Sequence, residues 1–304
     1  MKKIRFLEYL GLLFIIVGLA LEKKEVIISY VNHFIGLFGN NGIEERNEYY
    51  REVDFTFVKN TDDFKPNNYQ DILNIYYTVI NSGVEEFTFQ CDSEYKNCLD
   101  DIDVLATSQE TLSDINNYVH PYNSFTHVET TYNSLGSITI SVVKAYTQEE
   151  IDLINKAIDD VYDKLVIEGN TVEENIKNVH DYIINNTKYD TSRKYGDSQY
   201  NSDTAYGALF EGYAVCGGYA DTMSLFLNRM NIPNFKVSSE KHVWNAVYIN
   251  GKWVNLDLTW DDPISIDNGD YLEYSFFLID SNTMLTIEQT EHSFNQETYS
   301  ELVN

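Results

Sequence analysis

The sequence predicts an α+β fold, because one long helical pattern is followed by an antiparallel hairpin pattern. Apolar residues from Val215 to Met230 recur at three- and four-residue steps, and Asn231 and Pro233 then stop the helix. Alternating residues from His242 to Trp260 flank Asn250-Gly251, a two-residue turn typical of hairpins. Shorter helical and strand patterns precede both. We therefore expect the helix to pack on an antiparallel sheet.

The length and composition of the chain limit the number of domains it can form. The 304 residues, of which 43% are hydrophobic, suffice for two domains behind an N-terminal segment. We predict a signal anchor or signal peptide with a juxtamembrane helix at 1–40. A small α+β domain of unknown role at 41–146 and a catalytic domain at 147–304 follow it.

The chain is strongly acidic, with a formal net charge of −27 from 48 acidic and 21 basic residues. Such a surface repels phosphates, so nucleic acid is excluded as a partner, and anionic lipid or polyanionic wall polymers are disfavoured. A cationic protein or peptide would be attracted, whereas the acidity can equally serve solubility alone. A protein or peptide substrate is the partner class that remains.

The N-terminus predicts a link to the membrane. Lys2, Lys3 and Arg5 precede an apolar run from Tyr9 to Leu21. As a helix, this run spans about 20 Å, which is less than the roughly 30 Å of a hydrocarbon core. It is therefore either a secretory signal, cleaved after Gly18-Leu19-Ala20, or an uncleaved signal anchor. Basic residues before the run favour a catalytic domain on the extracytoplasmic side, secreted if cleavage occurs.

The 41–146 domain is expected to contain two helices and several strands. The predicted elements are a strand at Tyr50–Val58, a helix at Gln70–Ile80, a strand at Glu86–Cys91, a helix at Asp101–Tyr118, and a hairpin formed by Asn123–Tyr132 and Ser137–Tyr146. No residue cluster in this domain suggests chemistry, so we expect it to be a spacer or a docking domain.

Cysteine usage separates Cys216 from the other two cysteines. Cys91 and Cys98 are close in sequence, and a local disulfide between them is plausible in an oxidising compartment. The alternative is two independent thiols in an edge loop. A zinc knuckle is excluded, because the spacing is wrong and no histidine pair lies close by.

The 147–304 domain opens with two helix starts. Thr147 with Glu150, and Thr171 with Glu174, are capping boxes. A polar loop from Tyr189 to Asp203 is predicted to cover the mouth of a cleft. Residues 271–279 are rich in aromatic side chains and are predicted to form another core strand, and the acidic tail from Asp280 is left unassigned.

The chemistry is concentrated between Cys216 and Asp257. Cys216 falls in the first turn of its helix, where unpaired backbone N–H groups and the helix dipole favour an anion. Gly217 and Gly218 are expected to leave room for a substrate backbone. If Ile249 pairs with Lys252, alternation places the following side chains on one sheet face: His242, Trp244, Ala246, Tyr248, Trp253, Asn255, Asp257 and Thr259. Asp257 is then a diagonal neighbour of His242.

The segments GYAVCGGYA, HVWNAV and DLTWDDP resemble the core of the transglutaminase-like superfamily, in which Cys, His and Asp occur in this order. The resemblance covers about residues 171–279, favours the bacterial members of the superfamily and implies a papain-like topology. It also implies Tyr206, in AYGAL, as an oxyanion candidate beside the backbone N–H of Cys216.

Other polar and aromatic residues near these segments receive simpler assignments. Trp244 and Trp260 are predicted to line the cleft. Asp261 and Asp262 are interpreted as a polar turn in preference to a calcium site, and His180 as a packing residue beside apolar neighbours.

The predicted reaction is acyl transfer from a carboxamide, with Cys216 as nucleophile, His242 as base and Asp257 as the group that orients the base. Neither a cofactor nor a metal is required. Hydrolysis of peptide or amide bonds is favoured. Cross-linking of glutamine to lysine is an alternative, and a non-catalytic surface binding module on the same fold is another.

Overall fold

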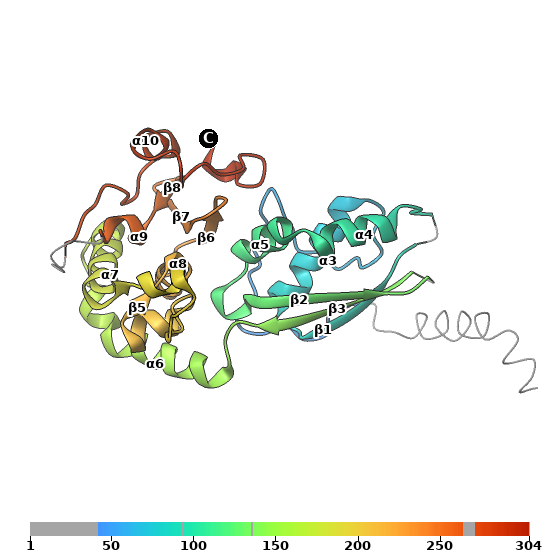
Figure 1. Cartoon of the computed structure of the whole chain (residues 1–304), viewed down its shortest axis with the longest axis horizontal. Coiled ribbons are helices and arrows are strands. Elements are labelled where there is room, and N and C mark those ends of the chain that lie inside the picture. Colours follow the sequence, from blue (N-terminus) through green and yellow to red (C-terminus); the bar gives the residue numbers. More distant parts are fainter. Residues whose placement is uncertain (1–41, 93, 135, 264–270, 304) are drawn as a thin grey trace, which may run out of the picture.

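The computed structural model describes residues 42–92, 94–134, 136–263 and 271–303 (Figure 1). The predicted signal segment at 1–40 lies outside these residues. Among the described helices, none combines the length and the apolar character needed to cross a membrane. Helices and strands are mixed throughout, as the predicted α+β class requires.

The N-terminal half contains a three-stranded antiparallel sheet, in the order β1-β3-β2, covered by three helices (Figure 1). Its elements are α3 (Tyr69–Ser82), β1 (Glu86–Gln90), α4 (Cys98–Thr107), α5 (Gln109–Tyr118), β2 (Phe125–Tyr132) and β3 (Ser137–Lys144), with a short 3₁₀ turn at Pro121–Asn123. The helix predicted at 70–80, the strand at 86–91 and the hairpin are therefore confirmed.

Two predictions for this half are wrong. Tyr50–Val58 is not a strand, because its backbone groups bond elsewhere than to a neighbouring strand. The N–H of Phe55 donates to Val58 O at 3.0 Å, and the N–H of Arg51 donates to the Asn81 side chain on α3 at 3.1 Å. The single helix predicted over 101–118 is two helices. Ser108 separates them, since its hydroxyl accepts the Thr111 N–H and caps α5.

The C-terminal half places helices against a second antiparallel sheet, in the order β6-β7-β8. Its helices are α6 (Gln148–Leu165), α7 (Val172–Asn186), α8 (Cys216–Arg229), α9 (Leu258–Asp261) and α10 (Ser281–Ile287). Its strands are β4 (Lys188–Tyr189), β5 (Tyr213–Ala214), β6 (Asn234–Ser238), β7 (Val243–Ile249) and β8 (Lys252–Leu256). Short 3₁₀ turns lie at Thr191–Tyr195 and Ser300–Leu302, and a π-helical turn lies at Gly207–Glu211.

Most helix starts predicted in the C-terminal half are confirmed. Both capping boxes form, at Thr147 with Glu150 and at Thr171 with Glu174. The α8 helix begins one residue after its predicted start. The strand predicted at 271–279 is wrong, because this segment forms a single isolated bridge, between Ile279 and Asn255 of β8.

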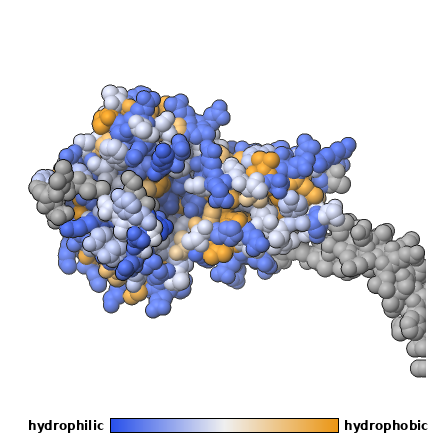
Figure 2. Space-filling view, viewed as in Figure 1, coloured by the Kyte–Doolittle hydropathy of each residue, from blue (hydrophilic) through white to orange (hydrophobic). Residues whose placement is uncertain are grey.

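One of the two hydrophobic clusters of the described residues is a core that both halves share. Helix α5 packs on β6, and Tyr118 of α5 stacks on Phe235 of β6 with ring centroids 4.9 Å apart. Arg51 is partly buried at this junction and donates to Tyr118 O at 3.1 Å and to Asn234 O at 2.7 Å. The face drawn in Figure 2 is mostly hydrophilic, with small scattered apolar areas, as the many charged residues predict.

Candidate active site

Cys216 is the first residue of α8 and its thiol is partly exposed. The preceding Val215 is the N-cap and makes no side-chain hydrogen bond to the helix, so no side chain caps the first-turn N–H groups. The segment that leads into the cysteine is held by β5, which pairs in parallel with β4. The N–H of Val215 also donates to Ser202 O at 2.8 Å. The thiol is thus fixed at the positive end of a buried helix.

The two glycines after Cys216 serve a purpose other than the predicted one. A Cβ on Gly218 would lie 2.5 Å from Ser202 O and 3.0 Å from Thr204 O, and one on Gly217 would lie 3.1 Å from Asp203 O. The space beside these glycines is therefore occupied by the backbone of 202–204. The expectation that they leave room for a substrate is wrong, since they admit the chain itself.

The predicted hairpin register is confirmed. Ile249 pairs with Lys252, Tyr248 with Trp253 and Ala246 with Asn255. Asn250 and Gly251 both have positive φ, 53° and 80°, as a tight hairpin turn of this kind requires.

The hairpin is shorter than predicted. Strand β8 ends at Leu256, and residues 258–261 form α9 instead of a strand. Asp257 is the N-cap of α9: its Oδ1 accepts the N–H groups of Thr259 at 2.9 Å and Trp260 at 3.3 Å. Alternation nevertheless leaves Asp257 on the same side as His242, which lies one residue before β7.

His242 and Asp257 form a short, buried hydrogen bond. Nε2 of His242 lies 2.5 Å from Oδ2 of Asp257, and the two residues are 6% and 1% exposed. Cys216 lies close enough to His242 to raise the pKa of its imidazole. Because Asp257 occupies Nε2, Nδ1 is the ring nitrogen left for the thiol. The three predicted residues are therefore in contact, in the order Cys216, His242, Asp257.

His242 and Asp257 each stabilise the charged form of the other. Burial by itself lowers the pKa of His242, but the Asp257 carboxylate and then Cys216 outweigh it and raise that pKa to about 10. Burial likewise raises the pKa of Asp257, but the charge of His242 and the hydrogen bonds from His242 and His292 lower it to about 2. At neutral pH His242 is therefore an imidazolium and Asp257 a carboxylate.

His292 is the residue that the sequence did not indicate. It is 0% exposed, and its Nε2 lies 2.9 Å from the same Oδ2 of Asp257 that meets His242. Its Nδ1 lies 3.2 Å from Oε2 of Glu288. No motif surrounds His292, so only the tertiary fold could bring it to the site.

Tyr189 is a second residue found only in the structure. It belongs to β4, and burial, followed by the charge of Cys216, raises its pKa. A neutral phenol is thus held near the thiol. The oxyanion candidate Tyr206 precedes the π-helical turn and stacks on Phe210 with centroids 4.9 Å apart. The described hydrogen bonds include none from Tyr206 to Cys216, so its role remains a prediction.

The two tryptophans differ in position. Trp244 is 1% exposed, donates from Nε1 to Asn255 Oδ1 at 2.9 Å, and stacks beside His242. The prediction that Trp244 lines an open cleft is therefore wrong, since it packs beneath the histidine. Trp260 is partly exposed and packs against Phe276.

His180 and Asp261 form a separate buried pair. Nε2 of His180 lies 3.1 Å from Oδ2 of Asp261, and Nδ1 lies 3.0 Å from Asp181. Asp261 also accepts the Phe276 N–H at 2.9 Å. His180 is therefore hydrogen-bonded as well as packed. Asp261 belongs to α9, and Asp262 accepts a hydrogen bond from Tyr219, so these aspartates are more than a polar turn.

One group of side chains has the composition of a metal site. Single ligand atoms of His242, Asp257 and His292 lie within 4.8 Å of one another. The two N···O distances of 2.5 and 2.9 Å are shorter than the roughly 3.3 Å between ligands on a tetrahedral zinc ion. The arrangement therefore fits hydrogen bonding better than metal coordination.

Part of the chain is similar to known proteins. Residues 160–258 match the model of the transglutaminase-like superfamily. One solved structure, described as a TGase, is 16% identical over 48% of this chain and 48% of its own, with a TM-score of 0.32. Another, a candidate cysteine protease from Cytophaga hutchinsonii, is 15% identical over 48% of this chain and 65% of its own, with a TM-score of 0.28. The matched regions thus span about half of the first structure and under two thirds of the second. No curated protein matches the chain significantly.

Proposed function

We propose that this chain is a thiol enzyme that transfers acyl groups from carboxamides through Cys216, His242 and Asp257, because residues 160–258 match the model of the transglutaminase-like superfamily. Hydrolysis of a peptide or amide bond is the favoured reaction. The observation that carries the proposal is the 2.5 Å hydrogen bond between His242 and Asp257, with Cys216 as the other partner of the same imidazole. A nucleophile, a base and an orienting carboxylate in contact are the parts that acyl transfer needs.

The first half of the reaction forms a thioester. The Cys216 thiolate attacks the carboxamide carbon, and the carbonyl electron pair moves to oxygen. The first-turn N–H of Cys216 is positioned to stabilise that oxyanion. The His242 imidazolium then gives its Nδ1 proton to the leaving nitrogen as the C–N bond breaks. Asp257 holds the ring and its charge throughout.

The second half releases the acyl group. Water attacks the thioester carbon while His242 takes one of its protons. The C–S bond breaks, the acid leaves, and the thiolate and imidazolium are restored. An amine in place of water would give a cross-link by the same steps, so the second nucleophile decides the product.

Alkylation separates an enzyme from a binding module. Iodoacetamide should modify Cys216 at neutral pH much faster than it modifies a free thiol, because His242 lies beside it as a base. A Cys216 that reacts no faster than free cysteine would contradict the enzyme proposal. Cys216→Ala should abolish turnover and keep the thermal unfolding midpoint, and activity that survives this substitution would exclude Cys216 as the nucleophile.

Product analysis separates hydrolysis from cross-linking. A glutamine-containing peptide is incubated with a labelled primary amine, and acid or ammonia release is compared with amine incorporation. Hydrolysis predicts that release dominates. Incorporation in excess of release would make the chain a cross-linking enzyme.

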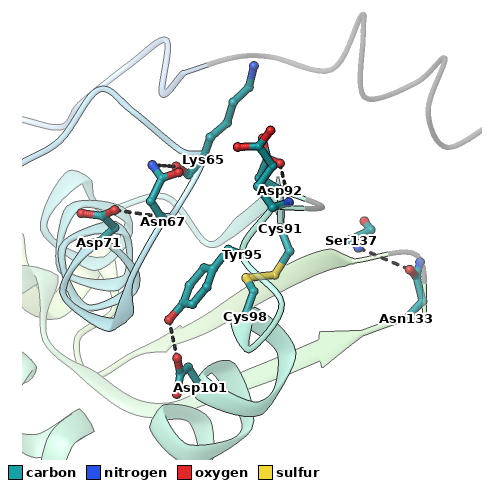
Figure 3. Close-up of a disulfide and its surroundings, with 11 residues drawn as sticks. Lys65, Asn67, Asp71, Cys91, Asp92, Tyr95, Cys98, Asp101, Asn133 and Ser137 are labelled. Atoms are coloured by element: carbon teal, nitrogen blue, oxygen red, sulfur yellow. Dashed lines mark hydrogen bonds between the residues drawn. A yellow bond between two sulfur atoms is a disulfide. The ribbon is translucent and has the colours of Figure 1, made fainter.

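An oxidising, extracytoplasmic location is part of the proposal. Its support is the Cys91–Cys98 disulfide, which ties the end of β1 to the start of α4 beside the β2–β3 turn (Figure 3). Such bonds persist outside the reducing cytosol. N-terminal sequencing of the mature protein, with free-thiol counting, tests it: three reactive thiols in the native protein would contradict this location.

A further inference from the structure

A buried imidazole that the proposed mechanism does not use lies directly behind Asp257. We propose that His292 is a positioning residue, which holds the Asp257 carboxylate in the orientation that presents Oδ2 to Nε2 of His242. The expected effect of His292 on turnover rests on the proposed function. The structural consequence, the orientation of His242 toward Cys216, can be measured without a substrate.

The contacts of His292 fix both ends of its ring. Nε2 lies 2.9 Å from Asp257 Oδ2, and Nδ1 lies 3.2 Å from Glu288 Oε2. Glu288 is itself held, because Oε1 accepts the Thr290 N–H at 2.9 Å and Oε2 accepts the Glu291 N–H at 2.7 Å. Burial raises the pKa of Glu288, but these backbone donors outweigh it, so the net shift is downward and the side chain is a carboxylate at neutral pH.

Aromatic side chains hold the plane of the ring. His292 stacks on Phe276 with centroids 4.8 Å apart and an interplanar angle of 16°. Trp244 meets it edge-on at 5.1 Å, and Trp260 is tilted against it at 5.5 Å. With one hydrogen bond at each end and aromatic rings around it, His292 has little freedom to turn. It is a rigid support for the carboxylate.

The hydrogen bonds of Asp257 explain why such a support matters. A carboxylate offers about four acceptor positions. Oδ1 takes the N–H groups of Thr259 and Trp260, and Oδ2 takes the imidazoles of His242 and His292. Without His292, one position on Oδ2 is left empty in a dry site. The carboxylate can then rotate about its bond to Cβ and carry His242 away from Cys216.

The donor role of His292 does not depend on its charge. Both ring nitrogens face carboxylate oxygens, which accept and do not donate. Nε2 can therefore donate to Asp257 from the imidazolium and from the neutral tautomer that carries its proton on Nε2. The ionisable groups around it are Asp257 and His242 on one side and Glu288 on the other, and burial, together with the charge of Asp257, raises the pKa of Asp261.

Two substitutions separate positioning from packing. His292→Phe keeps an aromatic ring and removes the donor, whereas His292→Gln keeps an N–H donor near the position of Nε2. We expect His292→Phe to lower kcat roughly 10- to 100-fold with KM within about twofold, because misplacement of a catalytic group acts on the chemical step. His292→Gln should restore kcat to within about threefold of wild type.

The pH dependence of Cys216 alkylation by iodoacetamide distinguishes the two roles. Its inflection point should not change if His292 only packs against its neighbours. In His292→Phe its inflection should shift to higher pH, because a misaligned carboxylate stabilises the thiolate–imidazolium pair less, and His292→Gln should reverse the shift. His180→Gln is the control: it removes another fully buried imidazole bonded to carboxylates, and the inflection should stay in place. Thermal unfolding of all three variants monitors folding.

The outcomes distinguish this inference from the proposed function. If wild type cleaves no carboxamide but the inflection still moves with His292→Phe and returns with His292→Gln, the proposed function fails and the positioning role holds. If wild type is active and His292→Phe matches it in kcat and inflection, the positioning role alone fails. An inflection that moves to lower pH, or stoichiometric zinc that is lost in His292→Phe, would also overturn it.

Discussion

Asp257 links two tasks at the scale of a single residue. Its Oδ1 caps α9, and its Oδ2 receives two imidazoles, so the same carboxylate orders the backbone and orients the proposed base. Asp257→Asn tests the second task. An amide oxygen can still cap α9, but the amide nitrogen would face Nε2 of His242 and favour the wrong tautomer. We expect kcat to fall by about 10³- to 10⁴-fold, with thermal unfolding showing a modest change.

The measurement for Asp257→Asn is turnover of a chromogenic amide together with the rate of Cys216 alkylation. Both should fall, since the imidazolium loses its counter-charge. Unchanged alkylation with lost turnover would show that Asp257 acts on the substrate and leaves the thiol unaffected. Asp181→Asn is a matched control, because Asp181 contacts His180 on α7 and has no described bond to the site.

Stability should depend on pH through the same pair. The folded pKa of His242, about 10, lies above its ordinary value of 6.5, so its contribution is complete below pH 6.5 and is lost as pH rises toward 10. The folded pKa of Asp257, about 2, lies below 3.8, so its contribution is present above pH 3.8 and is lost as pH falls toward 2. The free energies of unfolding of wild type and His242→Gln should therefore differ most between pH 3.8 and pH 6.5 and become equal above pH 10. Urea unfolding at a series of pH values measures this difference.

Single residues were predictable only where a local pattern surrounds them. Cys216, His242 and Asp257 stand at a helix start and at two strand ends, so their contact could be inferred from the sequence. His292 has no such context: it is 35 residues beyond Asp257 and meets it only because the tail after α10 folds back. Trp244 was placed on the correct face of the hairpin, but its burial beneath His242 depends on packing that alternation does not reveal.

At the scale of elements, the hairpin shows what a turn motif can and cannot determine. Asn250-Gly251 sets the pairing of β7 with β8 because both residues adopt positive φ. The end of β8 is set by the side chain of Asp257, which starts a helix instead of continuing the ladder. The sequence predicts register more reliably than it predicts strand ends, because register follows from backbone geometry and the end from one side-chain bond.

The packing of α8 on the 202–204 segment yields a prediction at this scale. Gly218→Ala places a Cβ 2.5 Å from Ser202 O, and backbone atoms on both sides leave little room to adjust. We expect a loss of roughly 1–3 kcal/mol in the free energy of unfolding, and reduced alkylation of Cys216, because the start of α8 must shift. Gly217→Ala, with a closest contact of 3.1 Å, should cost less. Equal effects in both variants would contradict this account of the packing.

At the scale of the whole molecule, the disulfide should affect stability without affecting the candidate active site. Cys91 and Cys98 close a short loop at the far end of the N-terminal sheet (Figures 1 and 3). Replacing both by serine should lower the free energy of unfolding by about 2 kcal/mol, because the unfolded chain is released from the loop. Alkylation of Cys216 in the folded state should be unchanged. A slower alkylation would show that the loop acts on the site over a distance.

The shared core predicts that both halves unfold together. Arg51 lies at the junction and donates to Tyr118 O on one half and Asn234 O on the other. Arg51→Ala removes these bonds and two weaker ones, at 3.5 Å, to the side chains of Asn228 and Asn234. We expect a loss of about 3 kcal/mol in the free energy of unfolding. Arg46→Ala is the matched control: its ion pair with Asp62 is exposed, and its loss should cost less than about 1 kcal/mol.

The three tryptophans provide the probe for that experiment, because Trp244, Trp253 and Trp260 all belong to the C-terminal half. Urea unfolding is followed by tryptophan fluorescence and by far-ultraviolet circular dichroism. If the core is one unit, the two transitions coincide in wild type and shift together in Arg51→Ala, although Arg51 itself lies in the N-terminal half. A fluorescence transition that stays in place while the circular dichroism transition splits would show two independently folding units.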